Sequence, residues 1–165
     1  GEGSFIFPAN GANTPVEILE SDSPLIVERR ELLIDSGGAG QQRGALGRRE
    51  VFRVPSDHYA PQPPVNLGIQ SGRFRIPPDG LFGGKPGAKA NFLVNDQVGN
   101  PYGLTRLKPG DVVVMDAAGG GGYGDAKKRE RESIIRDVRD GKVSRESALK
   151  DYGVEITEEM ILNEQ

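Results

Sequence analysis

Three glycine-rich blocks interrupt the apolar stretches of this chain and limit the folds that it can adopt. They read SGGAGQQRGALG (36–47), PPDGLFGGKPGAKA (77–90) and AAGGGGYGD (117–125). Glycine supplies 24 and proline 12 of the 165 residues. Both residue types occur mainly in turns and at the ends of helices and strands, and rarely in their interiors. We therefore expect short strands joined by long loops and not a helix bundle. Apolar runs such as PLIVERRELLI and DVVVM favour a folded body over a disordered one.

Short segments before residue 116 alternate apolar and polar residues or form compact apolar runs, as strands do. Strands are predicted over 16–20, 24–35, 48–54, 67–76 (as one strand or a bent pair) and 91–95, and residues 107–116 are predicted to form a Pro-Gly turn that leads into a buried strand. The charged centre of the second of these, from Glu28 to Glu31, is expected to face solvent or a partner. The proline-rich stretch 55–66 is predicted to be a loop or a strand edge, because proline cannot donate to a central ladder.

After Gly124 the apolar residues recur at helical spacing and no longer alternate with polar residues. Two sets of residues are expected to pack inward from helices: Ile134, Ile135 and Val138, and then Ala148, Leu149 and Tyr152. Gly141 and Gly153 suit the positions just past two helix ends, Ser144 suits a cap, and a last turn begins at Thr157. The mixed charges of these helices favour a docking appendage over a DNA-binding pair.

We therefore predict an α+β fold in a single domain. Its β-rich body, mostly antiparallel and sandwich-like or barrel-like, covers residues 1–124. Two or three short C-terminal helices over residues 125–165 form an appendage packed on that body.

Charge and composition exclude several classes of function. The net charge is −3, with 21 basic and 24 acidic residues interspersed, so no nucleic-acid footprint is present. The absence of cysteine removes disulfides, cysteine-type zinc sites and thiol nucleophiles. No apolar stretch approaches the roughly 20 residues of a membrane span. We expect a cytoplasmic protein without membrane or nucleic-acid partners, and the first residue, Gly1, suggests a piece of something longer.

The stretch VVVMDAAGGGGYGD resembles a dinucleotide fingerprint, since Gly119, Gly121 and Gly124 have GxGxxG spacing after an apolar strand. That fingerprint needs a second parallel strand after the helix. Here a second helix follows instead, so we reject a dinucleotide site. Gly119, Gly120, Gly121 and Gly122 are predicted to form a turn of close approach, with the lining of a pocket or subunit interface as the sharper alternative.

Other candidate residues carry weaker signals. The motif GGKPG fails the phosphate-loop pattern and leaves Lys85 as a candidate anion contact. His58, the only histidine, lies beside Asp57 and Tyr59 and is expected to be exposed or locally hydrogen-bonded instead of binding a metal. Ser36 would need His58 as its base to act as a nucleophile, which we do not favour. We predict no catalytic, cofactor-binding or metal-binding residue in this segment.

Six blocks in fixed order carry a resemblance to a known family. They are NTPVEILE, VERRELLIDSGGAGQQRGALG, GLFGGKPGA, LKPGDVV, GGGGYGD and RDVRDGKVSRESALKDYGV, and they extend from Asn13 to Val154. Together they resemble the C-terminal portion of the hydantoinase B/5-oxoprolinase family. That family includes the B-type subunit of ATP-dependent N-methylhydantoinase and the large subunit of acetone carboxylase.

The resemblance implies part of an ATP-dependent cyclic amide hydrolase, inactive alone, that supports the active site and subunit assembly. It implies ATP with Mg²⁺ on a hydantoinase A-like subunit and a divalent metal held by the N-terminal part of the B-type subunit. Partners would be the rest of the B-type subunit and the A-like subunit, in an oligomer. Arg43, Arg73 and Lys85, with the glycine loops, are the candidate pocket or interface contacts. Two alternatives stay open: a non-catalytic β-rich binding or assembly module, and a fragment of an acetone carboxylase-like subunit.

Overall fold

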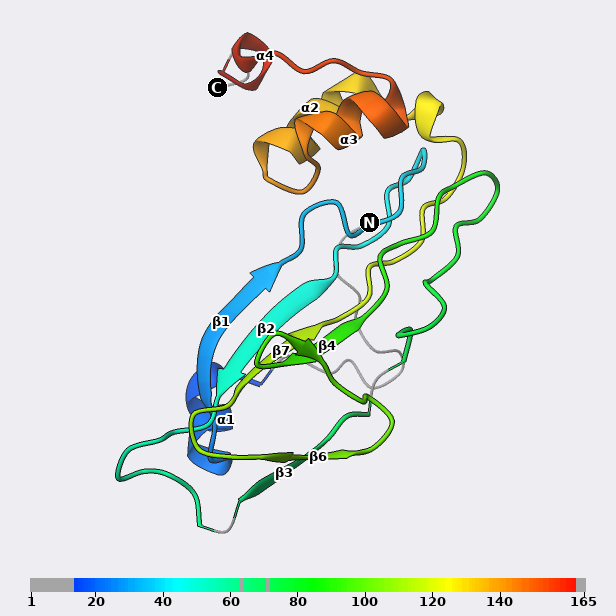
Figure 1. The fold of residues 1–165 in the computed structure, drawn as a ribbon. Helices are drawn as coiled ribbons and strands as arrows, with labels where there is room; N and C mark the ends of the chain where they lie inside the picture. The colour runs from blue at the N-terminus through cyan, green and yellow to red at the C-terminus, as the bar shows by residue number, and fades with distance from the viewer. Residues whose placement is uncertain (1–13, 63, 71, 163–165) are drawn as a thin grey trace.

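Seven strands form two sheets in the residues that the computed structural model describes, namely 14–62, 64–70 and 72–162 (Figure 1). The main sheet has the order β1-β2-β7-β4-β5, with bounds Ile26–Leu32, Arg48–Arg53, Val112–Asp116, Asn91–Val94 and Gln97–Val98. The smaller sheet pairs β3 (Val65–Gly68) with β6 (Leu104–Leu107). The pairings between these strands are antiparallel, which confirms the predicted character of the β-rich body.

One face of the main sheet shares its core with the smaller sheet. The register places Phe52 opposite Val113 and Val113 opposite Val94, so the three side chains lie on the same face. The buried members of this core are Phe52, Val54, Phe92, Leu107 and Val113. Leu107 comes from the smaller sheet and is fully buried, so the arrangement is sandwich-like. Full burial of such a side chain contributes about 1.5–3 kcal/mol.

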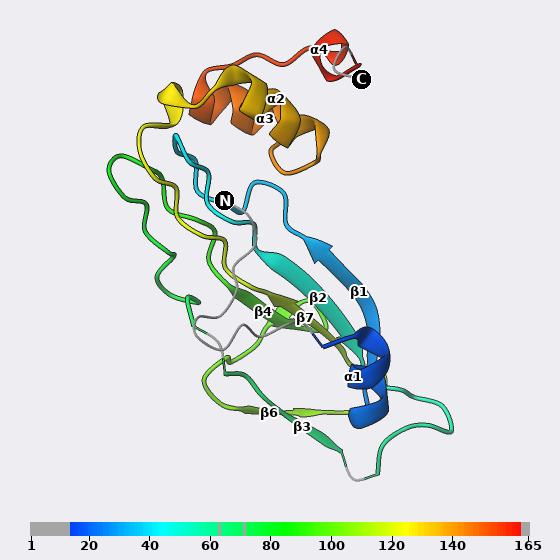
Figure 2. The ribbon, with the colours of Figure 1, turned by 180° about the vertical axis from the view of Figure 1, so that it is seen from behind.

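The C-terminal helices build a second core at the other end of the molecule. They are η1 (Ala126–Lys128), α2 (Arg131–Arg139), α3 (Arg145–Ser147), the π-helical turn η2 (Ala148–Tyr152) and α4 (Glu158–Leu162). Their buried residues cluster with Ala39 from the first glycine block. Figures 1 and 2 show these helices at one end, with the β3–β6 pair at the opposite end and the glycine blocks in between. The predicted helices after the β-rich body are confirmed.

The predicted helix ends are confirmed in detail. The backbone N–H of Ser147 donates to the Ser144 hydroxyl oxygen at 3.0 Å. Gly141 and Gly153 have φ values of 67° and 72°, a left-handed conformation that glycine adopts without strain. The inward packing of Leu149 was wrong, because that side chain is 56% exposed. The predicted packing of Ala148 and Tyr152 is confirmed, since both are buried, and Leu149 is the next residue around the helix.

The predicted strand over 16–20 is wrong, because this segment begins helix α1 (Val16–Asp22). Leu19 packs against the core of the main sheet. The backbone N–H and the hydroxyl of Ser23 both donate to the carbonyl of Leu19, at 3.0 and 2.8 Å, and close the helix. Five residues with three apolar members fit a helical turn as well as a strand, and packing selected the helix.

The predicted strand over 67–76 is also mostly wrong. Strand β3 begins earlier, at Val65, and ends at Gly68. Arg73 has a φ of 70°, a left-handed conformation that is incompatible with a continuous strand. The predicted Pro-Gly turn and strand over 107–116 are confirmed, because Gly110 has a φ of 89° and strand β7 begins at Val112.

Candidate functional site

The three glycine blocks meet in one hydrogen-bonded unit, here called the glycine bundle (residues 36–47, 78–88 and 119–124). The backbone N–H of Gly38 donates to the carbonyl of Gly120 at 2.8 Å, linking the first block to the third. The N–H of Gly122 donates to the carbonyl of Lys85 at 2.9 Å, linking the third block to the second. The backbone N–H of Lys85 in turn donates to the carbonyl of Ala39 at 2.7 Å, linking the second block to the first. Each block therefore satisfies backbone groups of the other two.

Side chains would not fit inside this bundle. A Cβ atom on Gly119 would lie 1.8 Å from the Ser36 carbonyl oxygen, and one on Gly121 would lie 1.9 Å from the Asp79 carbonyl oxygen. The predicted close approach at these glycines is therefore confirmed. The predicted turn is wrong, because residues 119–122 are in neither a turn nor a helix, and none of the four has a positive φ. The lack of side chains at these four glycines lets neighbouring backbone segments approach closely. It does not serve to reverse the direction of the chain.

The pairing of strand β7 explains why the GxGxxG spacing of Gly119, Gly121 and Gly124 does not indicate a dinucleotide-binding fold. Strand β7, which leads into these glycines, pairs antiparallel with both β2 and β4. A dinucleotide fold needs parallel neighbours around such a strand. The strand arrangement around β7 therefore differs from the one that such a fingerprint requires.

Arg43, a predicted pocket or interface contact, lies in a buried ionic cluster. Its Nε donates to Asp137 Oδ2 at 3.0 Å, and Arg129 Nη2 donates to the same oxygen at 2.7 Å. Arg43 and Asp137 are each 6% exposed. Burial raises the pKa of the nearby Tyr152 phenol. This cluster fastens helix α2 to the first glycine block.

Lys85 and Arg73, the other two predicted contacts, lie in different surroundings. Lys85 Nζ binds Asp151 Oδ1 at 2.6 Å, which joins the second glycine block to η2. Arg73 is exposed, and its carbonyl accepts a hydrogen bond from the N–H of Ala90 at 3.1 Å. Arg43 and Lys85 both hold the helical tail, whereas Arg73 has no such contact among those described, so the three residues form no common site. Their contact with a partner stays a prediction.

A small cavity with both charged and apolar lining residues lies beside the end of strand β7 and was not predicted from the sequence. Its volume is about 170 Å³, and its lining includes Arg48, Glu50, Asn91 and Asp116. Asp116 accepts two hydrogen bonds from Arg49, at 2.7 and 2.8 Å, and this pairing raises the pKa of the Arg49 guanidinium. The three consecutive charged residues that open RREVFR are the one signal in the sequence that could have indicated it.

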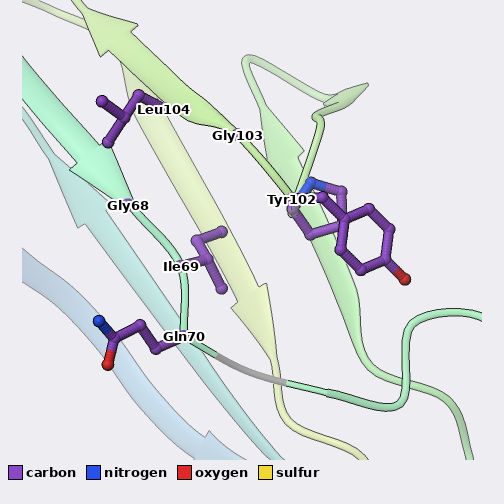
Figure 3. A pocket seen from close by; sticks show the side chains of 7 residues that line it. Gly68, Ile69, Gln70, Tyr102, Gly103 and Leu104 are labelled. Atoms are coloured by element: carbon purple, nitrogen blue, oxygen red, sulfur yellow. The ribbon is translucent and has the colours of Figure 1, made fainter.

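An open groove of about 560 Å³ lies where β3 ends and β6 begins (Figure 3). Its lining includes Gly68, Ile69, Gln70, Tyr102, Gly103 and Leu104. Leu104 is 79% exposed and Tyr102 is 60% exposed. The lining offers one phenol and one amide and no carboxylate or imidazole, so it holds no acid–base pair.

His58 and Ser36 have local partners. The His58 ring lies 3.9 Å from the Tyr59 ring, centroid to centroid, and is exposed. The buried Ser36 hydroxyl donates to the Leu33 carbonyl and accepts from the Gly47 N–H, which holds the first glycine block in place. Among residues 14–162 that are described, no group of three His, Cys, Asp or Glu side chains is arranged to hold a metal ion.

Two solved structures of larger chains share the fold of most of this chain. A solved structure of acetone carboxylase, titled for the mechanism of ATP-dependent acetone carboxylation, is similar to this chain with a TM-score of 0.70 and 24% identity. The match covers 90% of this chain and 24% of that one, and it shows the shared fold. An ATP-dependent caprolactamase from Pseudomonas jessenii is similar with a TM-score of 0.68 and 29% identity, over 87% of this chain and 25% of that one.

Sequence similarity identifies the family. The family described as Hydantoinase B/oxoprolinase matches residues 1–126, so the chain belongs to it. An uncharacterized protein of Methanocaldococcus jannaschii is 37% identical over 148 residues, which is 87% of this chain and 25% of that protein. The chain thus spans about a quarter of the length of the curated relatives that it matches. None of the helices within the described residues is long and apolar enough to cross a membrane.

Proposed function

We propose that this chain is the C-terminal portion of the B-type subunit of an ATP-dependent enzyme that hydrolyses cyclic amides. The observation that carries the proposal is the family match over residues 1–126, in a chain that spans a quarter of its relatives. The similarity to a protein titled ATP-dependent caprolactamase supports the cyclic amide class. In this role the chain supports the active site and subunit assembly, and it supplies no catalytic residue of its own.

The geometry supports a scaffold role. The glycine bundle has no room for additional atoms at Gly119 or Gly121, and buried ions fasten its helical tail. A scaffold needs such rigidity, because active-site groups elsewhere have to be held within fractions of an ångström. ATP with Mg²⁺ and a divalent metal belong, in this proposal, to an A-type subunit and to the rest of the B-type subunit, in a cytoplasmic oligomer. Arg73 and the surface of the glycine bundle are the proposed contacts.

The test uses the full coding region that contains this segment, expressed together with its A-type neighbour. Phosphate release and ring opening are measured with ATP and ε-caprolactam, hydantoin or 5-oxoproline. We expect phosphate release that depends on one of these cyclic amides in the assembly and none from the 165-residue chain. Turnover by the chain alone, or an assembly that is inactive with all three, would contradict the proposal.

A second candidate is a subunit of a ketone carboxylase, which the fold similarity to acetone carboxylase favours. The same assembly would then release phosphate only when a ketone and bicarbonate are both present. The product would be a 3-oxo acid: the α carbon of the ketone loses a proton and bonds to the bicarbonate carbon, while one bicarbonate oxygen leaves with phosphate derived from ATP. Chromatography of the products separates the two candidates.

A further inference from the structure

The tip of the second glycine block carries an exposed apolar cluster, here called the aromatic tip (Leu81, Phe82 and Tyr123). Leu81 is 60% exposed, Phe82 is 78% exposed and Tyr123 is 50% exposed. The two aromatic rings lie 5.1 Å apart, centroid to centroid, and are tilted by 60°. Single exposed apolar residues are common on protein surfaces, whereas clusters of this kind mark interaction sites.

The backbone at Phe82 is in a conformation that aromatic residues rarely adopt. Phe82 and Gly83 have φ values of 51° and 92°, and the N–H of Gly84 donates to the carbonyl of Leu81 at 3.0 Å. These features describe a type I′ turn, whose first central position normally holds Asn, Asp or Gly. A phenylalanine there is strained by its Cβ atom.

The surrounding bundle holds this strained turn in place. The N–H of Leu81 donates to the carbonyl of Gly122 at 2.9 Å, and the N–H of Gly124 donates to the carbonyl of Leu81 at 2.9 Å. The turn is therefore fixed from both sides of Leu81. Phe82 gains contact with the Tyr123 ring but little burial in return for the strain. Strain that the rest of the structure maintains at an exposed residue points to a function for that residue.

Another exposed aromatic residue provides a contrast. Tyr59 is 72% exposed and touches the His58 ring, but its φ is not in the left-handed region. Tyr59 is thus exposed without backbone strain. Exposure and strain coincide at Phe82.

The chemistry of the aromatic tip suits an apolar protein pocket. Its three side chains carry one hydroxyl and no charge, and the neighbouring Lys85 ammonium is bound to Asp151. Aromatic residues are enriched at the buried centres of protein interfaces. The tip lies within residues 1–126, which match the family, while three quarters of the relatives' length lies outside the matched segment. In the proposed B-type subunit such a remainder would be joined covalently to this segment, which makes it the nearest partner for the tip.

We propose that the aromatic tip inserts Phe82 into an apolar pocket of the remaining part of the same B-type subunit. This inference rests on the proposed function, because it requires the chain to be part of such a subunit. The strained turn then projects the ring into the pocket, and the glycine bundle fixes its direction.

The test places a photo-crosslinking benzophenone side chain at position 82 of the full subunit and maps its products by mass spectrometry. We expect crosslinks to residues of the same subunit outside the 165 residues of this segment. Crosslinks only to an A-type subunit or to a second copy, or no crosslink at all, would overturn the docking. Cyclic amide-dependent phosphate release by the unmodified assembly is measured in parallel, so that failure of the proposed function is recognised separately.

A second measurement compares Phe82→Asn in two settings. In the 165-residue chain, asparagine accepts the left-handed backbone, so the thermal midpoint is expected to stay equal or to rise. In the full subunit, the same variant loses the docked ring, so the midpoint is expected to fall. Tyr59→Asn is the matched control and should change neither midpoint. An equal response of Phe82→Asn in both settings would contradict the proposal.

Discussion

Replacing Gly121 by alanine tests whether the glycine bundle depends on the absence of side chains. The new Cβ atom would lie 1.9 Å from the Asp79 carbonyl oxygen, where an ordinary contact needs at least 3.4 Å. The two backbone segments must therefore separate by about 1.5 Å. The Asp79 carbonyl belongs to the main chain, so no side-chain rotation can relieve the clash. We expect the bundle to open at this point.

The magnitude follows from the hydrogen bonds that this separation stretches. The N–H of Leu81 donates to the Gly122 carbonyl and the N–H of Gly122 donates to the Lys85 carbonyl, both at 2.9 Å. Each buried bond left unmade costs about 1–3 kcal/mol, and overpacking adds a similar amount. Because Leu81 and Lys85 are exposed and water can replace part of the lost bonding, we expect a loss at the lower end of this sum, about 3–5 kcal/mol, which lowers the thermal midpoint by about 10 °C in a chain of this length.

Two further alanine variants separate the clash from a general effect of removing glycine. Gly72 has no atom within 4 Å of an added Cβ and no positive φ, so alanine there should be neutral or should stabilise by up to about 1 kcal/mol. At Gly120 the nearest atom would be 3.0 Å away, so a loss of about 1 kcal/mol is expected. Circular dichroism during heating measures all three. The reasoning is refuted if Gly121→Ala unfolds within about 1 °C of Gly72→Ala, because the expected loss corresponds to a far larger shift.

Three other predictions concern the ionic and capping contacts. Asp137→Leu removes the buried carboxylate that Arg43 binds and should cost about 3–5 kcal/mol in urea denaturation, while the double variant with Arg43→Met should recover part of that loss. The backbone hydrogen bond from Lys108 lowers the pKa of Asp111, so its stabilisation is complete above the unfolded pKa of about 3.9 and is lost as the pH falls through the lower folded pKa. Asp111→Asn should therefore flatten the acid side of the stability curve measured between about pH 2 and 6. Ser144→Ala should cost about 1 kcal/mol and Ser144→Gly only a few tenths, both measured in urea.

Much of the regular structure could be predicted, because burial leaves a pattern in the sequence. The strand over 48–54 places Phe52 and Val54, two residues apart, in the core of the main sheet, and helix α2 places Ile134 in the core of the tail. The segment 16–20 failed because five residues are too few to separate a period of 2 from a period of 3.6. Strand β5 has only two residues and leaves no pattern at all.

Less of the candidate site than of the fold could be predicted from the sequence. Glycine blocks indicate close approach, but backbone hydrogen bonds between distant segments leave no side-chain pattern that names the partners. The pairing of Arg43 with Asp137 joins residues 94 positions apart, and no local spacing encodes it. Arg43 and Lys85 are polar residues within the glycine blocks, and their position there predicts a contact without naming its partner. The structure shows that both bind residues of the helical tail. The strain at Phe82 depends on φ and is visible only in the fold.

The C-terminal helical tail is joined to each of the three blocks of the glycine bundle. Asp137 binds the first block through Arg43, Asp151 binds the second block through Lys85, and η1 continues directly from the third. Buried ion pairs lose as much solvation as they gain in attraction, so apolar packing could have given comparable stability. What a charged, hydrogen-bonded fork adds is a fixed orientation. The tail is therefore held to all three blocks of the glycine bundle, which carries the Phe82 turn, although the family match ends at residue 126.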